Sequence, residues 1–140
     1  MAKSTARGLR VPADLQYEIE REMERREIDE WSTMVVELLE DAVRARRAPG
    51  IVFVDGATGR RPVVAGSGLE VWEVVQAWKE VGRNYDRLRT AYDWLAEPQL
   101  RAALSYYELY GDEVDARLDR EARLTAERVQ NELPFTRPRG

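Results

Sequence analysis

The sequence TARGLRVPADLQYEIEREM, residues 5–23, decides the architecture of the N-terminal part of the chain. Residues 5–11 predict a short β-strand, and Pro12 follows, a residue favoured at helix starts because the N–H that it lacks has no partner there. A helix is expected over residues 13–27. Its apolar side chains recur every four positions, at Leu15, Ile19 and Met23. This helix can therefore pack along one narrow face.

A second helix is expected directly afterwards. Residues 28–31 form a connection, and Ser32 supplies a side-chain oxygen of the kind that caps a helix N-terminus. Apolar residues then follow at i, i+3, i+4, i+7 and i+8, namely Val35, Leu38, Leu39, Ala42 and Val43. This spacing is the full pattern of a buried helical face. Ala48-Pro49-Gly50 ends the helix, so the first module covers residues 1–48.

The remainder predicts a small hairpin followed by helices. Residues 51–54 are rich in β-forming side chains, residues 56–59 have turn composition, and residues 60–64 can return as a second strand with Pro62 at an edge. Three helical segments are expected after that, over residues 69–81, over residues 84–94, and from Pro98 past Tyr110. The predicted fold class is mainly α.

The same part of the chain holds most of the aromatic residues. Aromatic side chains at helical spacing are usually core residues. We expect a core position for Trp72, Trp78, Trp94, Tyr85, Tyr92, Tyr106 and Tyr107. The expected segments are a domain at residues 51–113, a charged helical extension at residues 114–129 and a flexible tail at residues 130–140.

Composition excludes several classes of function. A chain of 140 residues has room for one ordinary domain or two very small ones. It contains no Cys and no His, which removes disulfides, thiolate nucleophiles, Ser-His chemistry and the commonest soft metal ligands. We therefore expect no enzyme, no cofactor and no metal site. No apolar run approaches the roughly 18 residues of a membrane span, and a cytoplasmic protein is expected.

The charge pattern points to local and not to general nucleic-acid binding. The net charge of −4 argues against indiscriminate binding to DNA. Both ends are nevertheless basic, because Lys3, Arg7 and Arg10 precede any acidic residue and residues 128–140 hold three arginines against one glutamate. A local basic patch can therefore bind nucleic acid although the net charge of the chain is negative.

A lone strand before two helices needs a partner strand, because its backbone N–H and C=O groups would otherwise stay unpaired. The order RGLRVPADLQYEIEREM…WSTMVVELLEDAV resembles the ribbon-helix-helix family over residues 5–47. The resemblance implies a homodimer whose two-stranded ribbon lies in the DNA major groove. Period-two alternation directs Leu9 and Val11 to the core, and Ala6, Gly8 and Arg10 to the DNA.

The family's pattern also implies where phosphate is held. Ser32 and the backbone amides of Thr33 and Met34 would bind it at the start of the second helix. The family commonly has Gly after its first helix, where this chain has Glu27-Ile28-Asp29. The DNA-binding residues predicted for this module are Arg7, Gly8, Arg10, Ser32 and Thr33. A solvated Arg10 and a merely structural Ser32 are the alternative.

The second half carries another resemblance. GRRPVVAGSGLEVWEVVQAWKEVG (residues 59–82) and YDRLRTAYDWLAEPQLRAALSYYELYGDEVD (residues 85–115) resemble the small winged-helix-like domain of VapB-type antitoxins. Residues 84–94 and the helix after Pro98 form a helix-turn-helix candidate. Gln99 and Arg101 would lie in the first turn of its recognition helix, against base edges. The alternative is a domain that binds protein alone.

Together the two resemblances imply an antitoxin of a VapB/VapC-type module, which binds its own double-stranded promoter DNA and neutralises a PIN-domain ribonuclease. Such a nuclease holds Mg²⁺ or Mn²⁺ with carboxylates. In the tail, Leu133 and Phe135 could anchor in an apolar groove, while Arg137 and Arg139 could pair with those carboxylates. A stand-alone ribbon-helix-helix repressor is the alternative, and an unrecognised enzyme comes third.

Overall fold

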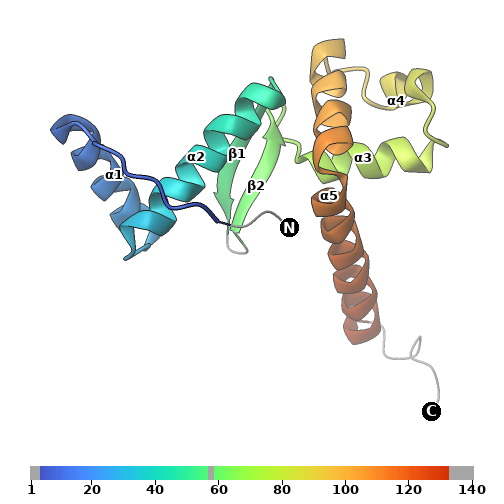
Figure 1. Ribbon diagram of the computed structural model, residues 1–140. Helices are drawn as coiled ribbons and strands as arrows, with labels where there is room; N and C mark the ends of the chain where they lie inside the picture. The colour runs from blue at the N-terminus through green and yellow to red at the C-terminus, as the bar shows by residue number, and fades with distance from the viewer. Residues whose placement is uncertain (1–3, 57–58, 133–140) are drawn as a thin grey trace. The chain divides into compact units, whose positions relative to one another are not determined.

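The computed structural model describes residues 4–56 and 59–132, and these ranges contain five α-helices and two β-strands (Figure 1). The elements follow in the order α1, α2, β1, β2, α3, α4 and α5. The chain divides into two compact units, one ending at Arg44 and one beginning at Ala45. The expected class, mainly helical with one small hairpin, is confirmed.

Helix α1 (Ala13–Arg26) begins directly after Pro12, as the sequence predicts. It ends at Glu27, whose backbone is left-handed with φ of 57°. The amide of Glu27 donates to the carbonyl of Glu24 at 3.3 Å, and the amide of Ile28 donates to that of Met23 at 2.9 Å. This closing motif usually contains Gly, because a left-handed backbone costs other residues about 1–2 kcal/mol.

Helix α2 (Trp31–Arg47) begins one residue before Ser32, so the expected capping position of Ser32 is wrong. The carbonyl oxygen of Glu30 accepts the amide of Met34 at 3.2 Å, which places Glu30 directly before the helix. A tertiary contact accompanies this earlier start, because the indole Nε1 of Trp31 donates to Oε1 of Gln16 in α1 at 2.9 Å.

The first unit buries little of its apolar surface. Ile19 and Met34 are the buried hydrophobic residues of its described part, residues 4–44. The face of α2 that the sequence predicts to be buried is largely uncovered, since Leu39 is 55% exposed and Val43 is 53% exposed. Val36 lies on the same side and is 53% exposed. We call Val36, Leu39 and Val43 the α2 apolar surface.

The remaining positions of the predicted face differ in exposure. Val35 and Leu38 are half-buried, and Ala42 is exposed. The periodicity therefore identified an apolar face correctly, but this face is not covered within one chain.

Residues 4–12 lie in no helix or strand, so the strand expected at residues 5–11 is absent from the single chain. The physical reason is that one strand alone cannot pair its backbone groups. We call residues 4–12 the N-terminal arm. Pairing of two such arms stays a prediction.

The second unit begins with a β-hairpin. Strands β1 (Ile51–Gly56) and β2 (Gly59–Val64) pair antiparallel, with Ile51 opposite Val64 and Gly56 opposite Gly59. Pro62 lies opposite Phe53. In a two-stranded sheet each strand has an unpaired side, so a residue without N–H is tolerated, as predicted.

Helices α3 (Val71–Glu80) and α4 (Tyr85–Ala91) follow the hairpin. Gly82 separates them with φ of 69°, a left-handed conformation that glycine adopts without steric cost. The side chain of Asn84 then caps α4 by accepting the amide of Arg87 at 3.0 Å. The end of α3 and the start of α4 lie within one residue of the predicted boundaries, whereas α3 begins two residues later and α4 ends three residues earlier than predicted.

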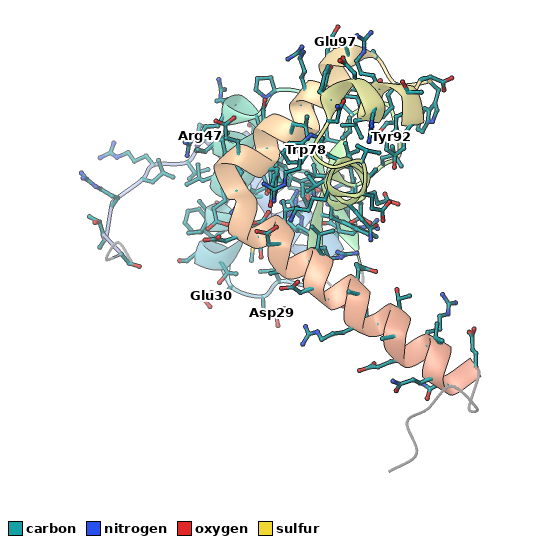
Figure 2. All side chains as sticks on the ribbon, turned by 90° about the vertical axis from the view of Figure 1, so that its right-hand side faces the viewer. Asp29, Glu30, Arg47, Trp78, Tyr92 and Glu97 are labelled. Carbon is teal, nitrogen blue, oxygen red and sulfur yellow. The ribbon has the colours of Figure 1, made fainter. Side chains whose placement is uncertain are left out.

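Helix α5 (Glu97–Glu132) is interrupted at Tyr110, where φ is −128° and ψ is 40°. It runs through the expected helical extension and into the segment expected to be flexible. Residues 130–132 are helical, so that part of the tail prediction is wrong. The side chains of residues 122–132 are exposed, and Figure 2 shows this end of α5 extending away from the helices that pack around its start.

The core of the second unit lies between the hairpin, α3, α4 and the first half of α5. Tyr106 is fully buried, and its ring lies 4.8 Å from that of Tyr110. The other predicted core aromatics pack against this core while staying partly exposed, namely Trp72, Trp78, Tyr85, Tyr92 and Tyr107. Trp94 is different, because it is 60% exposed and its predicted core position is wrong.

Trp94 lies in the connection between α4 and α5, outside the periodic part of either helix. Its ring contacts the edge of Tyr92, with the ring centres 6.0 Å apart. The prediction of a core position from helical spacing does not apply to Trp94, because this residue lies in no helix.

Candidate functional site

The N-terminal arm carries three of the predicted DNA-binding residues. Arg7, Gly8 and Arg10 are exposed, and no atom lies within 4 Å of the position that a Cβ on Gly8 would occupy. Among the residues that the structure describes, neither arginine has an ion-pair or hydrogen-bond partner. Both guanidinium groups are therefore available to a phosphate or a base.

Ser32 and Thr33 lie together in the first turn of α2 and are exposed. The surroundings are acidic, because Asp29 and Glu30 immediately precede this helix (Figure 2). The hydroxyl of Thr33 donates to Oε2 of Glu30 at 3.4 Å. A phosphate at this helix N-terminus would gain from the helix dipole and lose from the carboxylate of Glu30.

Gln99 lies near the start of α5, and its side-chain amide already has two partners. Its Oε1 accepts the backbone amide of Ala96 at 2.9 Å, and its Nε2 donates to the carbonyl of Ala65 at 3.0 Å. The second bond joins α5 to the loop after β2, across 34 positions of sequence. Gln99 therefore links the start of α5 to the loop after β2. A contact of its side chain with a DNA base would have to replace these two hydrogen bonds.

Arg101 is also engaged within the protein. Its guanidinium donates to Oε1 of Glu97 at 2.8 Å and lies 4.7 Å from the ring centre of Tyr85. The hydrogen bond from Arg101 lowers the pKa of the Glu97 carboxyl. Its side chain is 63% exposed, so a phosphate could still reach the guanidinium group.

The structure thus brings the candidate residues together in three separate places. Arg7, Gly8 and Arg10 share the N-terminal arm, Ser32 and Thr33 share the start of α2, and Gln99 and Arg101 share the start of α5. The predicted toxin-binding residues lie outside the described residues. They are Leu133, Phe135, Arg137 and Arg139.

Sequence reasoning missed a polar contact that crosses the second unit. Asp115 of α5 accepts hydrogen bonds from Lys79 Nζ at 3.0 Å and from the hydroxyl of Tyr107 at 2.8 Å. The hydroxyl of Tyr107 and then the ammonium of Lys79 lower the pKa of Asp115 below its usual range. No sequence signal marks this contact, because Lys79 and Asp115 are 36 positions apart.

Glu70 is a second polar centre that the sequence analysis did not identify. It directly precedes α3, and its carboxylate pairs with Arg61 of β2 at 3.5 Å and with Arg117 of α5 at 3.7 Å. Its backbone amide donates to the side chain of Glu73 at 2.8 Å. The spacing of Glu70 and Glu73 resembles a capping box, which could have indicated the helix start.

The described residues show neither a metal-binding cluster nor a membrane-spanning helix. Residues 4–56 and 59–132 contain no group of three Asp, Glu, His or Cys side chains arranged to hold a metal ion. Among the helices of the same ranges, none is long and apolar enough to cross a membrane.

Comparison with known proteins gives one match. Residues 51–107 match the family model described as Protein of unknown function (DUF433). The matched segment begins at the first residue of β1 and ends within the first half of α5, so it covers neither α1 nor α2. No curated protein and no solved structure matches the chain.

Proposed function

We propose that the protein is the antitoxin of a VapB/VapC-type module. In this proposal two chains dimerise through residues 5–47 as a ribbon-helix-helix unit, bind their own double-stranded promoter DNA, and neutralise a PIN-domain ribonuclease. The proposal rests on the two sequence resemblances and on the surface properties of the first unit.

The observation that carries the proposal is the α2 apolar surface. Val36, Leu39 and Val43 lie at i, i+3 and i+7, and each is more than half exposed. Exposed apolar side chains on one helix face favour association, because covering them releases water from apolar surface. A second copy of the chain would cover α2 in the ribbon-helix-helix arrangement.

The N-terminal arm supports the DNA-binding part of the proposal. The backbone of residues 4–11 lies in no ladder in the part of the chain that the structure describes, so its N–H and C=O groups could pair with a second arm. Arg7 and Arg10 have no partner in the part of the chain that the structure describes. In the dimer, Arg10 would donate both guanidinium branches to a guanine, and Arg7 would lie near phosphate.

The second unit plays a smaller part in DNA binding in this proposal. Gln99 would have to give up its bonds to Ala65 and Ala96 before meeting a base edge. Arg101 would have to leave Glu97 or share its guanidinium with a phosphate. In this proposal the ribbon therefore recognises the base sequence of the DNA, and the second unit contributes at most contacts to the DNA phosphates.

The neutralisation of the nuclease is assigned to the C-terminal tail on its chemistry alone. Arg137 and Arg139 would pair with the metal-binding carboxylates, and Phe135 would anchor the tail in an apolar groove. Deletion of residues 133–140 preserves the whole of α5 and should spare promoter binding. It should also restore RNA cleavage by the partner nuclease.

The test is co-expression with the product of the adjacent reading frame, followed by an RNA-cleavage assay of the purified complex. Arg137→Ala combined with Arg139→Ala should restore cleavage, whereas Thr136→Ala, a change without charge in the same segment, should leave inhibition intact. Full inhibition by the chain lacking residues 133–140 would refute the role of the tail. Operator binding with no co-purifying nuclease would favour a stand-alone repressor.

A further inference from the structure

The second unit contains a cavity of about 160 Å³ between β2, the start of α3 and the second half of α5. Liquid water occupies about 30 Å³ per molecule, so the cavity has room for about five water molecules or for one small organic group. The charged and aromatic residues that line it are Arg60, Glu70, Trp72, Glu113, Arg117 and Arg120.

Two hydrogen-bond donors of this lining have no acceptor. Nε1 of Trp72 is buried with less than 1 Å² exposed and has no hydrogen-bond partner. Arg120 has no ion pair or hydrogen bond within residues 4–56 and 59–132. A buried donor without an acceptor is unfavourable and calls for an explanation, which a ligand oxygen would supply.

The carboxylates of the lining are largely engaged. Glu70 pairs with Arg61 and Arg117, although its Oε1 has no hydrogen-bond partner, and Glu113 accepts a hydrogen bond from the hydroxyl of Tyr106. The N–H groups of Trp72 and Arg120 therefore outnumber this one acceptor. The ligand of the cavity should consequently bring acceptor oxygens.

The charge of the lining limits the charge of that ligand. Three arginines and two glutamates line the cavity, and Asp55 and Glu121 pair from outside it with Arg60 at 3.6 Å and with Arg117 at 2.8 Å. A dianion such as phosphate would therefore meet stronger repulsion from Glu70 and Glu113 than a monoanion would. Arg117 and Arg120 are three positions apart on α5, a spacing that places their side chains on the same side of the helix.

We propose that this cavity binds a carboxylate group, held by Arg117 and Arg120 and completed by the indole N–H of Trp72. The carboxylate can come from a free short-chain acid or from an acidic side chain of another protein. This site does not depend on the proposed antitoxin function. It needs Arg117 and Arg120, which follow the segment that matches the family model, so the match does not account for it.

The indole N–H of Trp72 gives an NMR resonance that can report ligand binding at the site. The guanidinium of Arg117 lies 5.5 Å from the ring centre, so a carboxylate drawn to Arg117 changes the surroundings of the indole. The chain has four tryptophans and therefore four indole N–H resonances in a ¹⁵N-labelled sample. Trp78, which does not line the cavity, serves as the internal reference.

The experiment titrates the full chain with sodium acetate and, separately, with N-acetylglutamate amide, at constant ionic strength set with chloride. We expect a saturable shift of the Trp72 indole resonance and none of the Trp78 resonance. Saturation by acetate alone identifies a free small acid as the source, and saturation by the blocked glutamate identifies an acidic side chain; each supports the proposal.

Two variants on α5 test the role of the guanidinium. Arg120→Ala removes one charge-assisted bond and should weaken binding about tenfold. Arg123→Ala is the matched control, because Arg123 is exposed on the same helix but does not line the cavity. Both side chains are exposed, so neither change should disturb folding.

Three results would overturn the proposal. The first is a Trp72 shift that rises linearly with acetate and with the blocked glutamate, and the second is equal affinity in Arg120→Ala and Arg123→Ala. The third is inorganic phosphate binding more tightly than acetate, which would contradict the monoanion preference.

Discussion

Replacing Leu39 by Asp should dissociate the proposed dimer while leaving each chain folded. Leu39 is at the centre of the α2 apolar surface and is 55% exposed in the single chain. Complete burial of a Leu side chain contributes about 1.5–3 kcal/mol, so covering the exposed half contributes about 1 kcal/mol. A symmetric dimer covers this residue twice, which gives about 2 kcal/mol.

A loss of about 2 kcal/mol raises the dissociation constant about 30-fold, because 1.4 kcal/mol corresponds to a factor of ten. The introduced carboxylate adds to this loss, since it would be brought into an apolar interface without a partner. Sedimentation velocity over a concentration series measures the effect directly. We expect Leu39→Asp to sediment as a monomer at concentrations where the unchanged protein is a dimer.

Val52→Asp is the matched control for this experiment. Val52 lies in β1 and is 46% exposed, so the same kind of change is made at a similarly exposed apolar residue of the other unit. The helical circular dichroism of the Leu39→Asp chain should stay close to that of the unchanged chain, and its melting temperature should fall only at concentrations where the unchanged chain is dimeric. An unchanged dimer with Leu39→Asp, or dissociation by both variants, would refute the argument.

Three other predictions concern the arm, the turn after α1 and the contact at Asp115. Arg10→Ala should weaken specific binding of promoter DNA by about 1–3 kcal/mol, with the largest loss at one operator position; unchanged mobility shifts would contradict this. Glu27→Gly should stabilise the first unit by about 1 kcal/mol in urea unfolding, because Gly removes the cost of the left-handed backbone; a lower midpoint would count against it. The lowered pKa of Asp115 means that its bonds stabilise the fold above the unfolded value near 3.8, and that this contribution disappears as the pH falls through the lowered folded-state pKa. Asp115→Asn should accordingly be less stable than the unchanged chain at neutral pH, and the difference should vanish in acid.

Local chemistry made most of the helix and strand boundaries predictable. Pro12 and Gly82 act through backbone constraints and Asn84 acts through a side-chain cap, and all three operate within a few residues of the helix boundaries that they set. Ser32 failed as a cap because α2 starts at Trp31. The indole of Trp31 bonds to Gln16, and a contact across 15 positions cannot be read from local preference.

The candidate site was less predictable than the fold. The resemblance to the ribbon-helix-helix family and the alternation along residues 5–11 indicated that Arg10 could bind DNA, and the structure leaves that side chain exposed. Gln99 has the same chemical suitability, yet its amide bonds to Ala65 through the folded arrangement of the hairpin and α5. The cavity beside Trp72 combines β2, α3 and α5, and therefore exists only once the chain has folded.

The break at Tyr110 has a consequence for how long the protein would survive in a cell. Beyond this residue α5 packs on the core through Val114 and Leu118, whereas residues 122–132 have exposed side chains. An isolated helix shorter than about 12–15 residues is marginal in water. The end of α5 can therefore unwind while the core around Tyr106 stays intact. Such a segment gives a processive protease a starting point, so turnover of the protein would be set by this end of the helix and would slow whenever a bound partner holds it in place.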